Sequence, residues 1–65
     1  MTFYLTVDMD NAAFEEYDAG REVARILRKV AQSVDGFHYD EMAPDEPQPL
    51  RDINGNRVGE WKVTR

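Results

Sequence analysis

Residues 2–9 alternate between apolar and polar side chains, which is the pattern of a half-buried β-strand. The apolar positions are Phe3, Leu5, Val7 and Met9. Such a strand places one face on a core and turns the other toward solvent. Asp10 and Asn11 follow it and offer a helix cap, so we expect a short helical turn over residues 12–17 with Phe14 as its buried anchor.

The strongest periodic signal lies in residues 19–34, where apolar side chains recur at spacings of three and four. They are Val23, Ile26, Leu27, Val30 and Val34. We expect an amphipathic helix that Asp18 caps at its start and Gly36 ends. Since Leu27 belongs to the apolar stripe, we expect Leu27→Ala to cost about 2–5 kcal/mol of stability.

The C-terminal third has the pattern of a hairpin. Residues 50–53 and 57–64 are strand-like and flank Asn54-Gly55-Asn56, and Asn-Gly between two such runs is a strong hairpin signal. The preceding stretch, residues 37–48, is rich in proline and charge. It is predicted to be a surface loop, with a short extended piece over residues 38–42.

The element order of strand, helix, strand, strand predicts a single two-layer α+β domain. We expect a three-stranded antiparallel sheet with the last strand in the centre and one main helix on one face. The expected core consists of Phe3, Leu5, Val7, Ile26, Leu27, Val30, Ile53, Trp61 and Val63. The uncovered sheet face is expected to present Tyr4, Thr6, Val58, Glu60 and Lys62 to solvent or to a partner.

Composition narrows the function classes. The chain has 65 residues, no cysteine and one histidine, so disulfides, thiolate metal sites and histidine-rich zinc sites are excluded. Its net charge of −5 argues against direct binding of nucleic acid or of anionic membrane. No basic start with a long apolar run and no stretch of about 20 apolar residues is present, so we expect a cytoplasmic protein.

The carboxylates gather in two segments that contain no Lys or Arg, residues 1–18 and 35–46. The first segment holds Asp8, Asp10, Glu15, Glu16 and Asp18, and the second holds Asp35, Asp40, Glu41, Asp45 and Glu46. Acidic loops keep a small protein soluble, and they also steer a basic partner toward themselves. Each segment also carries a tyrosine, Tyr17 or Tyr39, and aromatic side chains beside charge are typical of interface anchors.

Catalytic and metal-binding motifs do not fit. The sequence from Asp8 resembles the start of an EF-hand loop, but the sixth and twelfth positions are Ala13 and Ala19 instead of Gly and Glu. Ser33, Asp35 and His38 are the only set with the residue types of a catalytic triad, and Ser33 lies within the predicted helix. We therefore expect no enzyme activity, no cofactor and no metal.

Three stretches carry a resemblance to a known family: Val7 to Phe14, Glu22 to Ala31, and Leu50 to Trp61. They resemble a family of small, mostly uncharacterised open reading frames of phages and prophages. The matched positions are a strand exit, a helix face and a hairpin turn, so the resemblance implies a fold and a phage setting but assigns no catalytic residue. In size and charge the chain is also similar to anti-CRISPR proteins, some of which imitate the phosphate charge of DNA.

The resemblance and the charge pattern together predict a non-enzymatic inhibitor. We expect it to bind a basic, nucleic-acid-binding surface of a host defence complex in the bacterial host cell. The first candidate is a type I CRISPR surveillance complex. We also expect the chain to be a monomer or weak dimer. If the two acidic segments lie at opposite ends, we expect only the second, with Tyr39, to touch the partner. The alternative is a phage structural or assembly protein that uses the uncovered sheet face.

Overall fold

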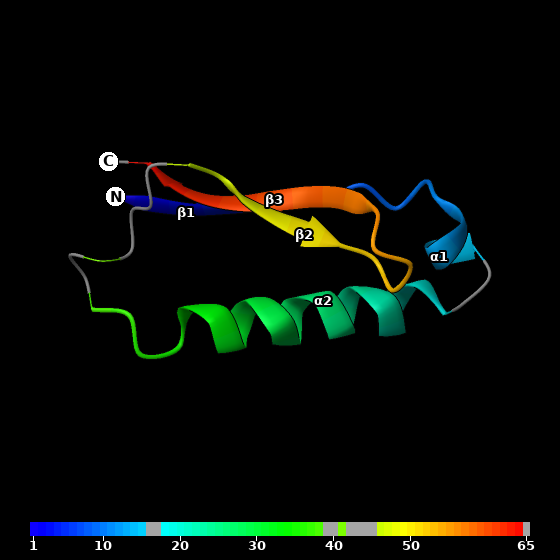
Figure 1. The fold of residues 1–65 in the computed structure, drawn as a ribbon, viewed down its shortest axis with the longest axis horizontal. Coiled ribbons are helices and arrows are strands. Elements are labelled where there is room, and N and C mark those ends of the chain that lie inside the picture. Colours follow the sequence, from blue (N-terminus) through cyan, green and yellow to red (C-terminus); the bar gives the residue numbers. More distant parts are fainter. Residues whose placement is uncertain (16–17, 39–40, 42–45, 65) are drawn as a thin grey trace.

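The computed structural model describes residues 1–15, 18–38, 41 and 46–64. Its elements are β1 (Thr2–Val7), α1 (Ala12–Glu15), α2 (Ala19–Val34), β2 (Gln48–Arg51) and β3 (Arg57–Thr64). The strands form an antiparallel sheet in the order β1-β3-β2, and α2 runs along one face of it (Figure 1). The structure thus confirms the predicted α+β fold with β3 in the centre. Within the described ranges, none of the helices has the length and apolar character needed to cross a bilayer.

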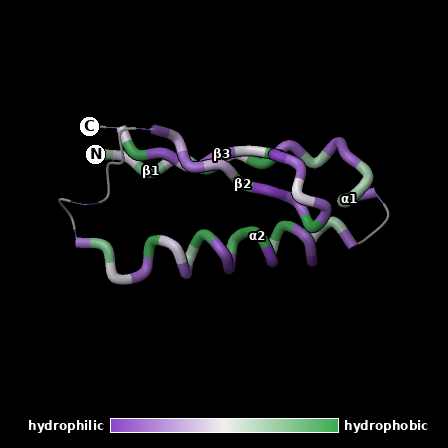
Figure 2. Tube along the Cα trace, viewed as in Figure 1, coloured by the Kyte–Doolittle hydropathy of each residue, from purple (hydrophilic) through white to green (hydrophobic). Residues whose placement is uncertain are grey.

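Local chemistry sets the ends of α2. The Asp18 carboxylate accepts hydrogen bonds from the backbone N–H groups of Gly20 at 3.0 Å and Arg21 at 3.4 Å, so it satisfies donors that have no partner inside the helix. At the other end Gly36 takes a positive φ of 89°, which a residue with a side chain rarely adopts. The predicted bounds of this helix are confirmed. Its hydrophobic positions turn toward the sheet (Figure 2).

The hairpin begins two residues earlier than expected. β2 ends at Arg51 because the Asp52 carboxylate accepts from the backbone N–H groups of Asn54 at 2.9 Å and Asn56 at 2.8 Å, which bends the chain. Gly55 has a positive φ of 87°, as expected for a turn followed by a left-handed residue. The Asn-Gly signal is therefore confirmed, whereas the predicted strand over residues 50–53 is wrong by two positions and lies at 48–51.

A β-bulge changes which side chains of β3 face the helix. Leu50 pairs with Gly59 but Arg51 pairs with Arg57, so Val58 is an extra residue on β3. The bulge turns Val58 into the core, where it is only 6% exposed. The prediction that Val58 lies on the uncovered face is wrong, because strict alternation does not hold across a bulge.

The core lies between α2 and the β2–β3 half of the sheet. Its buried members are Ala13, Phe14, Ile26, Val30, Leu50, Val58 and Trp61, with Leu5, Val7 and Val63 packed against them. Phe14 is buried as expected. The prediction is wrong for three residues that were expected in the core, since Phe3 is 41% exposed, Leu27 is 45% exposed and Ile53 is 55% exposed. Leu27 lies on the flank of the helix, Phe3 lies on an outer strand where it stacks on Trp61 at 5.4 Å, and Ile53 lies in the turn.

The segment between α2 and β2 is described only in part. The Glu41 amide donates to the His38 carbonyl at 2.9 Å in a turn, so the extended piece predicted over residues 38–42 is wrong at this position. Residues 39–40 and 42–45 of that predicted piece and loop lie outside the described residues.

Candidate functional site

The described carboxylates of the two acidic segments, Asp8 to Asp18 on the one side and Asp35, Glu41 and Glu46 on the other, lie at opposite ends of an elongated molecule whose longest dimension is 39 Å (Figure 1). The carboxylates of the first segment follow β1 and precede α2, so they lie at the end that also holds the β2–β3 turn. α2 ends at the second segment, and β2 starts from it. A partner surface that contacts one end of a single protomer therefore reaches the other end only if it extends along the whole molecule.

The first acidic end consists of Asp8, Asp10, Glu15 and Asp18, all of which are exposed. Asp8 accepts the Asp10 amide at 3.0 Å, and Asp18 caps α2. No side chain within the described ranges forms an ion pair with Asp10 or Glu15. Two of the four carboxylates thus hold the backbone in place, and the other two project into solvent. Glu16 and Tyr17 lie outside the described residues.

Two buried carboxylates, Glu22 and Asp52, support this end, and neither is among the residues that the sequence predicted to bind a partner. Glu22 is 5% exposed and accepts from Arg25 Nε at 2.6 Å and from the Ile53 amide at 2.8 Å. Asp52 is 4% exposed and accepts from the Asn11 side-chain amide at 2.7 Å, in addition to its two bonds within the turn. Glu22 therefore ties the turn to α2, and Asp52 ties it to the start of α1.

These hydrogen bonds favour the charged form of both buried carboxylates. The Arg25 guanidinium lowers the pKa of Glu22, burial acts against it, and the Ile53 amide lowers it further. Burial alone would raise the pKa of Asp52, but the bonds from Asn56, Asn54 and Asn11 together outweigh it and lower that pKa. Both groups are consequently ionised at neutral pH. The Arg25 guanidinium balances the charge of Glu22, so Asp52 is the one that adds negative charge behind the exposed carboxylates of the first end.

The second acidic end is described at Asp35, Glu41 and Glu46, whose side chains are exposed. The Asp35 amide donates to the Ala31 carbonyl at 3.0 Å and closes the last turn of α2. The Glu46 carbonyl accepts from the Gln48 side chain at 2.9 Å. The remaining residues predicted for this surface, Tyr39, Asp40 and Asp45, lie outside the described residues.

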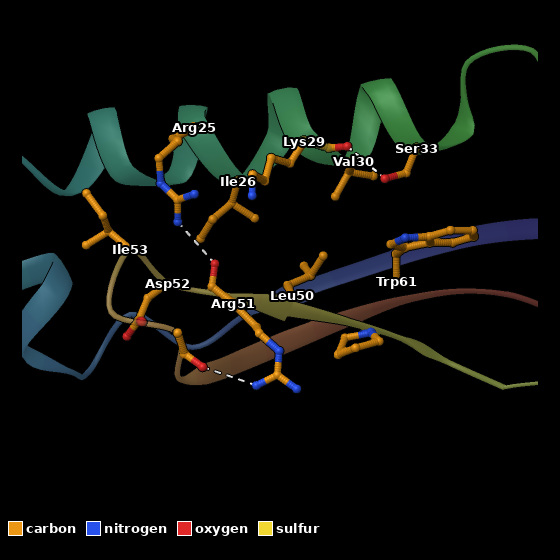
Figure 3. Close-up of a pocket in the computed structure, with 12 residues that line it drawn as sticks. Arg25, Ile26, Lys29, Val30, Ser33, Leu50, Arg51, Asp52, Ile53 and Trp61 are labelled. Atoms are coloured by element: carbon orange, nitrogen blue, oxygen red, sulfur yellow. Dashed lines mark hydrogen bonds between the residues drawn. The ribbon is translucent and has the colours of Figure 1, made fainter.

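An open groove of about 420 Å³ runs between α2 and β2 (Figure 3). Its apolar wall comes from Ile26 and Val30 of α2 together with Leu50 and Trp61 of the sheet. Arg25 spans the groove and donates to the Arg51 carbonyl at 3.1 Å, so its guanidinium is engaged within the fold. We therefore interpret the groove as the contact line between α2 and β2, which Arg25 crosses.

The residues weighed for catalysis or metal binding have local structural roles. The Ser33 hydroxyl donates to the Lys29 carbonyl at 3.0 Å, one turn back in the helix. Asn11, part of the sequence that resembled an EF-hand loop, accepts the Ala13 amide at 3.1 Å and caps α1. Among the residues that the structure describes, no three histidine or acidic side chains come close enough to hold a metal ion.

No protein family, curated protein or solved structure matches this chain. The resemblance to phage open reading frames stays a prediction, and the function has to be argued from the surface of the molecule itself.

Proposed function

We propose that this chain is a non-enzymatic binding protein whose first acidic end occupies a basic, nucleic-acid-binding surface of a host defence complex. The observation that carries the proposal is the group of exposed carboxylates Asp8, Asp10, Glu15 and Asp18 at one end of the domain, in a segment without a single basic residue. The proposed effect is to exclude DNA from that surface. The phage-like sequence pattern makes a type I CRISPR surveillance complex the first partner to test.

We favour the first end because its carboxylates adjoin a network of hydrogen bonds that fixes the backbone around them. Asp18 belongs to the helix start, and Glu22 and Asp52 bind the adjoining turn to both helices. A surface that is already ordered loses less conformational entropy on binding. Spread carboxylates at fixed positions also present the field of one sign that a groove built for phosphates attracts.

A competition assay tests the proposal, with the purified complex, labelled target DNA and increasing amounts of the protein. The variant Asp10→Lys/Glu15→Lys reverses two carboxylates that make no ion pair within the described ranges, so folding should be retained. We expect this variant to lose inhibition by at least tenfold. The matched control Glu41→Lys/Glu46→Lys makes the same charge change at the other end and should inhibit like the parent.

The outcomes separate the hypotheses. Loss of inhibition only in the Glu41→Lys/Glu46→Lys variant would move the binding surface to the second end, as the sequence pattern favoured. Full inhibition by both variants would show that charge mimicry is wrong. Circular dichroism of each variant must match the parent, so that lost inhibition is not lost structure.

A second candidate, an assembly protein that binds through the uncovered sheet face, has one observation in its favour. Tyr4 is 48% exposed on that face, and Lys62 Nζ lies 6.0 Å from the centre of its ring. With Val58 turned into the core, the face is more polar than the alternation predicted. An unmodified protein that does not inhibit DNA binding, but assembles into a complex that Tyr4→Asp abolishes, would favour this candidate.

A further inference from the structure

The two outer strands of the sheet differ in how they are protected against pairing. β2 has four residues, of which Pro49 lacks an N–H donor and Arg51 is charged. β1 has six residues, and none of them is charged or a proline. Natural sheets protect exposed edges with short strands, prolines and charges, since an unprotected edge is a template for a further strand. β1 has none of these protections.

The hydrogen bond that follows β1 shows which of its backbone groups point outward. The Asp8 amide donates to the Val58 carbonyl of β3, and Thr6 pairs with Glu60 in the same register. Inward and outward bonding alternates along an antiparallel strand. The N–H and C=O groups of Phe3, Leu5 and Val7 consequently face away from β3, at the outer edge of the sheet.

Apolar side chains line this outer edge on the helix side. Phe3 is 41% exposed and Leu27 of α2 is 45% exposed. Leu27 lies about 100° around the helix from Ile26, away from Arg25 and Lys29, which line the groove on the β2 side. Leu5, Val7 and Val23 are partly buried against the core. We call these five residues the apolar flank.

We propose that β1 pairs antiparallel with β1 of a second copy of this chain, so that two sheets join and two apolar flanks meet. A second copy fits this edge because β1 carries no charge and can pair with itself about Leu5. When Leu5 lies opposite Leu5 of the second copy, the outward N–H and C=O groups of one β1 strand face those of the other and can form hydrogen bonds. Phe3 then lies opposite Val7 of the second copy, and Tyr4 lies opposite its Thr6. Phe3, Leu5 and Val7 of both copies then lie on the helix side, and every contact occurs twice, as in a two-fold interface.

The pairing would also change how charge is distributed. Because the two β1 strands run in opposite directions, Asp8 lies opposite Thr2 of the second copy. The first acidic end of one copy then lies at the same end of the dimer as Asp35 and Glu46 of the other. The inference is independent of the proposed function, but it would give a partner a wider acidic surface than one protomer offers.

Cross-linking tests the proposed register, and the absence of cysteine from the chain gives a clean background. Tyr4 and Thr6 are both exposed in the protomer, so Tyr4→Cys and Thr6→Cys should fold. They would form a pair without hydrogen bonds, with a Cα separation of about 4.5 Å that suits a disulfide. A mixture of the two variants should yield a disulfide-linked dimer on mild oxidation, and each variant alone should yield little.

The control Glu60→Cys places a cysteine on the same sheet face but on the central strand, and its mixture with Tyr4→Cys should not form a linked dimer. Sedimentation of the unmodified chain should show a dimer at micromolar to sub-millimolar concentration. A monomer throughout that range, or equal cross-linking in all mixtures, would overturn the proposal. Cross-linking of Tyr4→Cys or Thr6→Cys alone as fast as of their mixture would overturn the register. A monomer that gains an added strand from another protein would assign the edge to that partner.

Discussion

At the scale of single residues, burial separates side chains that the sequence pattern treats alike. Ile26 and Leu27 are neighbours in the apolar stripe, yet Ile26 is 2% exposed and Leu27 is 45% exposed. A spacing of three and four marks a broad stripe, and the middle of that stripe depends on where the sheet lies. We therefore expect the large loss of stability on truncation to alanine at Ile26 and not at Leu27.

The first prediction compares these two neighbours. Ile26→Val should lower the free energy of unfolding by about 0.5–1.5 kcal/mol, because it leaves a cavity in the core. Leu27→Ala should change it by no more than about 0.5 kcal/mol, since the side chain is half in solvent. Urea unfolding at low protein concentration, where the protomer is followed, measures both. A larger loss for Leu27→Ala would contradict the described packing of α2.

The second prediction concerns Gly59, which lies opposite Val7 in the pairing of β3 with β1. A Cβ atom there would lie 1.9 Å from the Thr6 carbonyl oxygen, so the strands would have to separate. Gly59→Ala should lower the free energy of unfolding by about 1–3 kcal/mol. Gly20→Ala is the matched control: its Cβ would meet Asp18 at an ordinary 3.4 Å, and it should be neutral or stabilise the helix by up to about 1 kcal/mol. Thermal unfolding of the two variants should show opposite or clearly unequal shifts.

At the scale of elements, the joint between α2 and the β2–β3 turn holds the first acidic end together. Glu22 reaches from the helix to the Ile53 amide, and Arg25 reaches from the helix to the Arg51 carbonyl. Because the same two residues also pair with each other at 2.6 Å, the joint is one connected network. Its strength should depend on the charge of Glu22.

The third prediction follows from the lowered pKa values of Glu22 and Asp52. A carboxyl whose pKa is lower in the folded chain stabilises it above the unfolded pKa and loses this effect as pH falls through the folded pKa. Stability should therefore drop as the pH falls below about 4. Glu22→Gln should be less stable at neutral pH, by about 1–3 kcal/mol, and should lose less on acidification. Urea unfolding at neutral and acidic pH checks the sign, and an unchanged pH slope in Glu22→Gln would contradict it.

The sequence was informative about elements and less so about their contacts. The cap at Asp18, the stop at Gly36 and the Asn-Gly turn are local signals, and all three are confirmed. The bulge at Val58 depends on the register between β2 and β3, which no local pattern contains. The hydrogen bond from the Ile53 amide to Glu22 was hidden for the same reason, since the two residues are far apart along the chain.

The candidate site was predictable as charge but not as geometry. Two segments without a basic residue can be identified by counting, whereas their separation to opposite ends follows from the path of α2. One part of the network that supports the first end, the Asp52 turn, does have a local sequence signal. Asp52, Asn54 and Asn56 alternate through the turn, and such residues bond backbone amides nearby.

At the scale of the whole molecule, the structure offers two kinds of association that differ in their driving force. The first acidic end would bind a basic surface through exposed charges. The edge of β1 would bind a second copy through backbone hydrogen bonds and the apolar flank, within a strand that carries no charge. Charges exposed to solvent are screened beyond roughly 8 Å at physiological ionic strength, whereas apolar burial is not weakened by salt.

The fourth prediction is that salt separates these two associations. Raising the salt concentration several-fold should weaken inhibition of DNA binding markedly, because the contact with the basic surface depends on long-range attraction. The same change should leave the dimer as tight as before or slightly tighter, since it screens the repulsion between acidic ends that the antiparallel pairing brings together. Sedimentation and the competition assay, run in the same buffers, measure both. If the dimer dissociates with salt in step with the loss of inhibition, the self-association is electrostatic and the paired β1 edge is wrong. If inhibition instead persists at high salt, the partner is held by an uncharged surface, and Tyr4 on the open sheet face is the next residue to substitute.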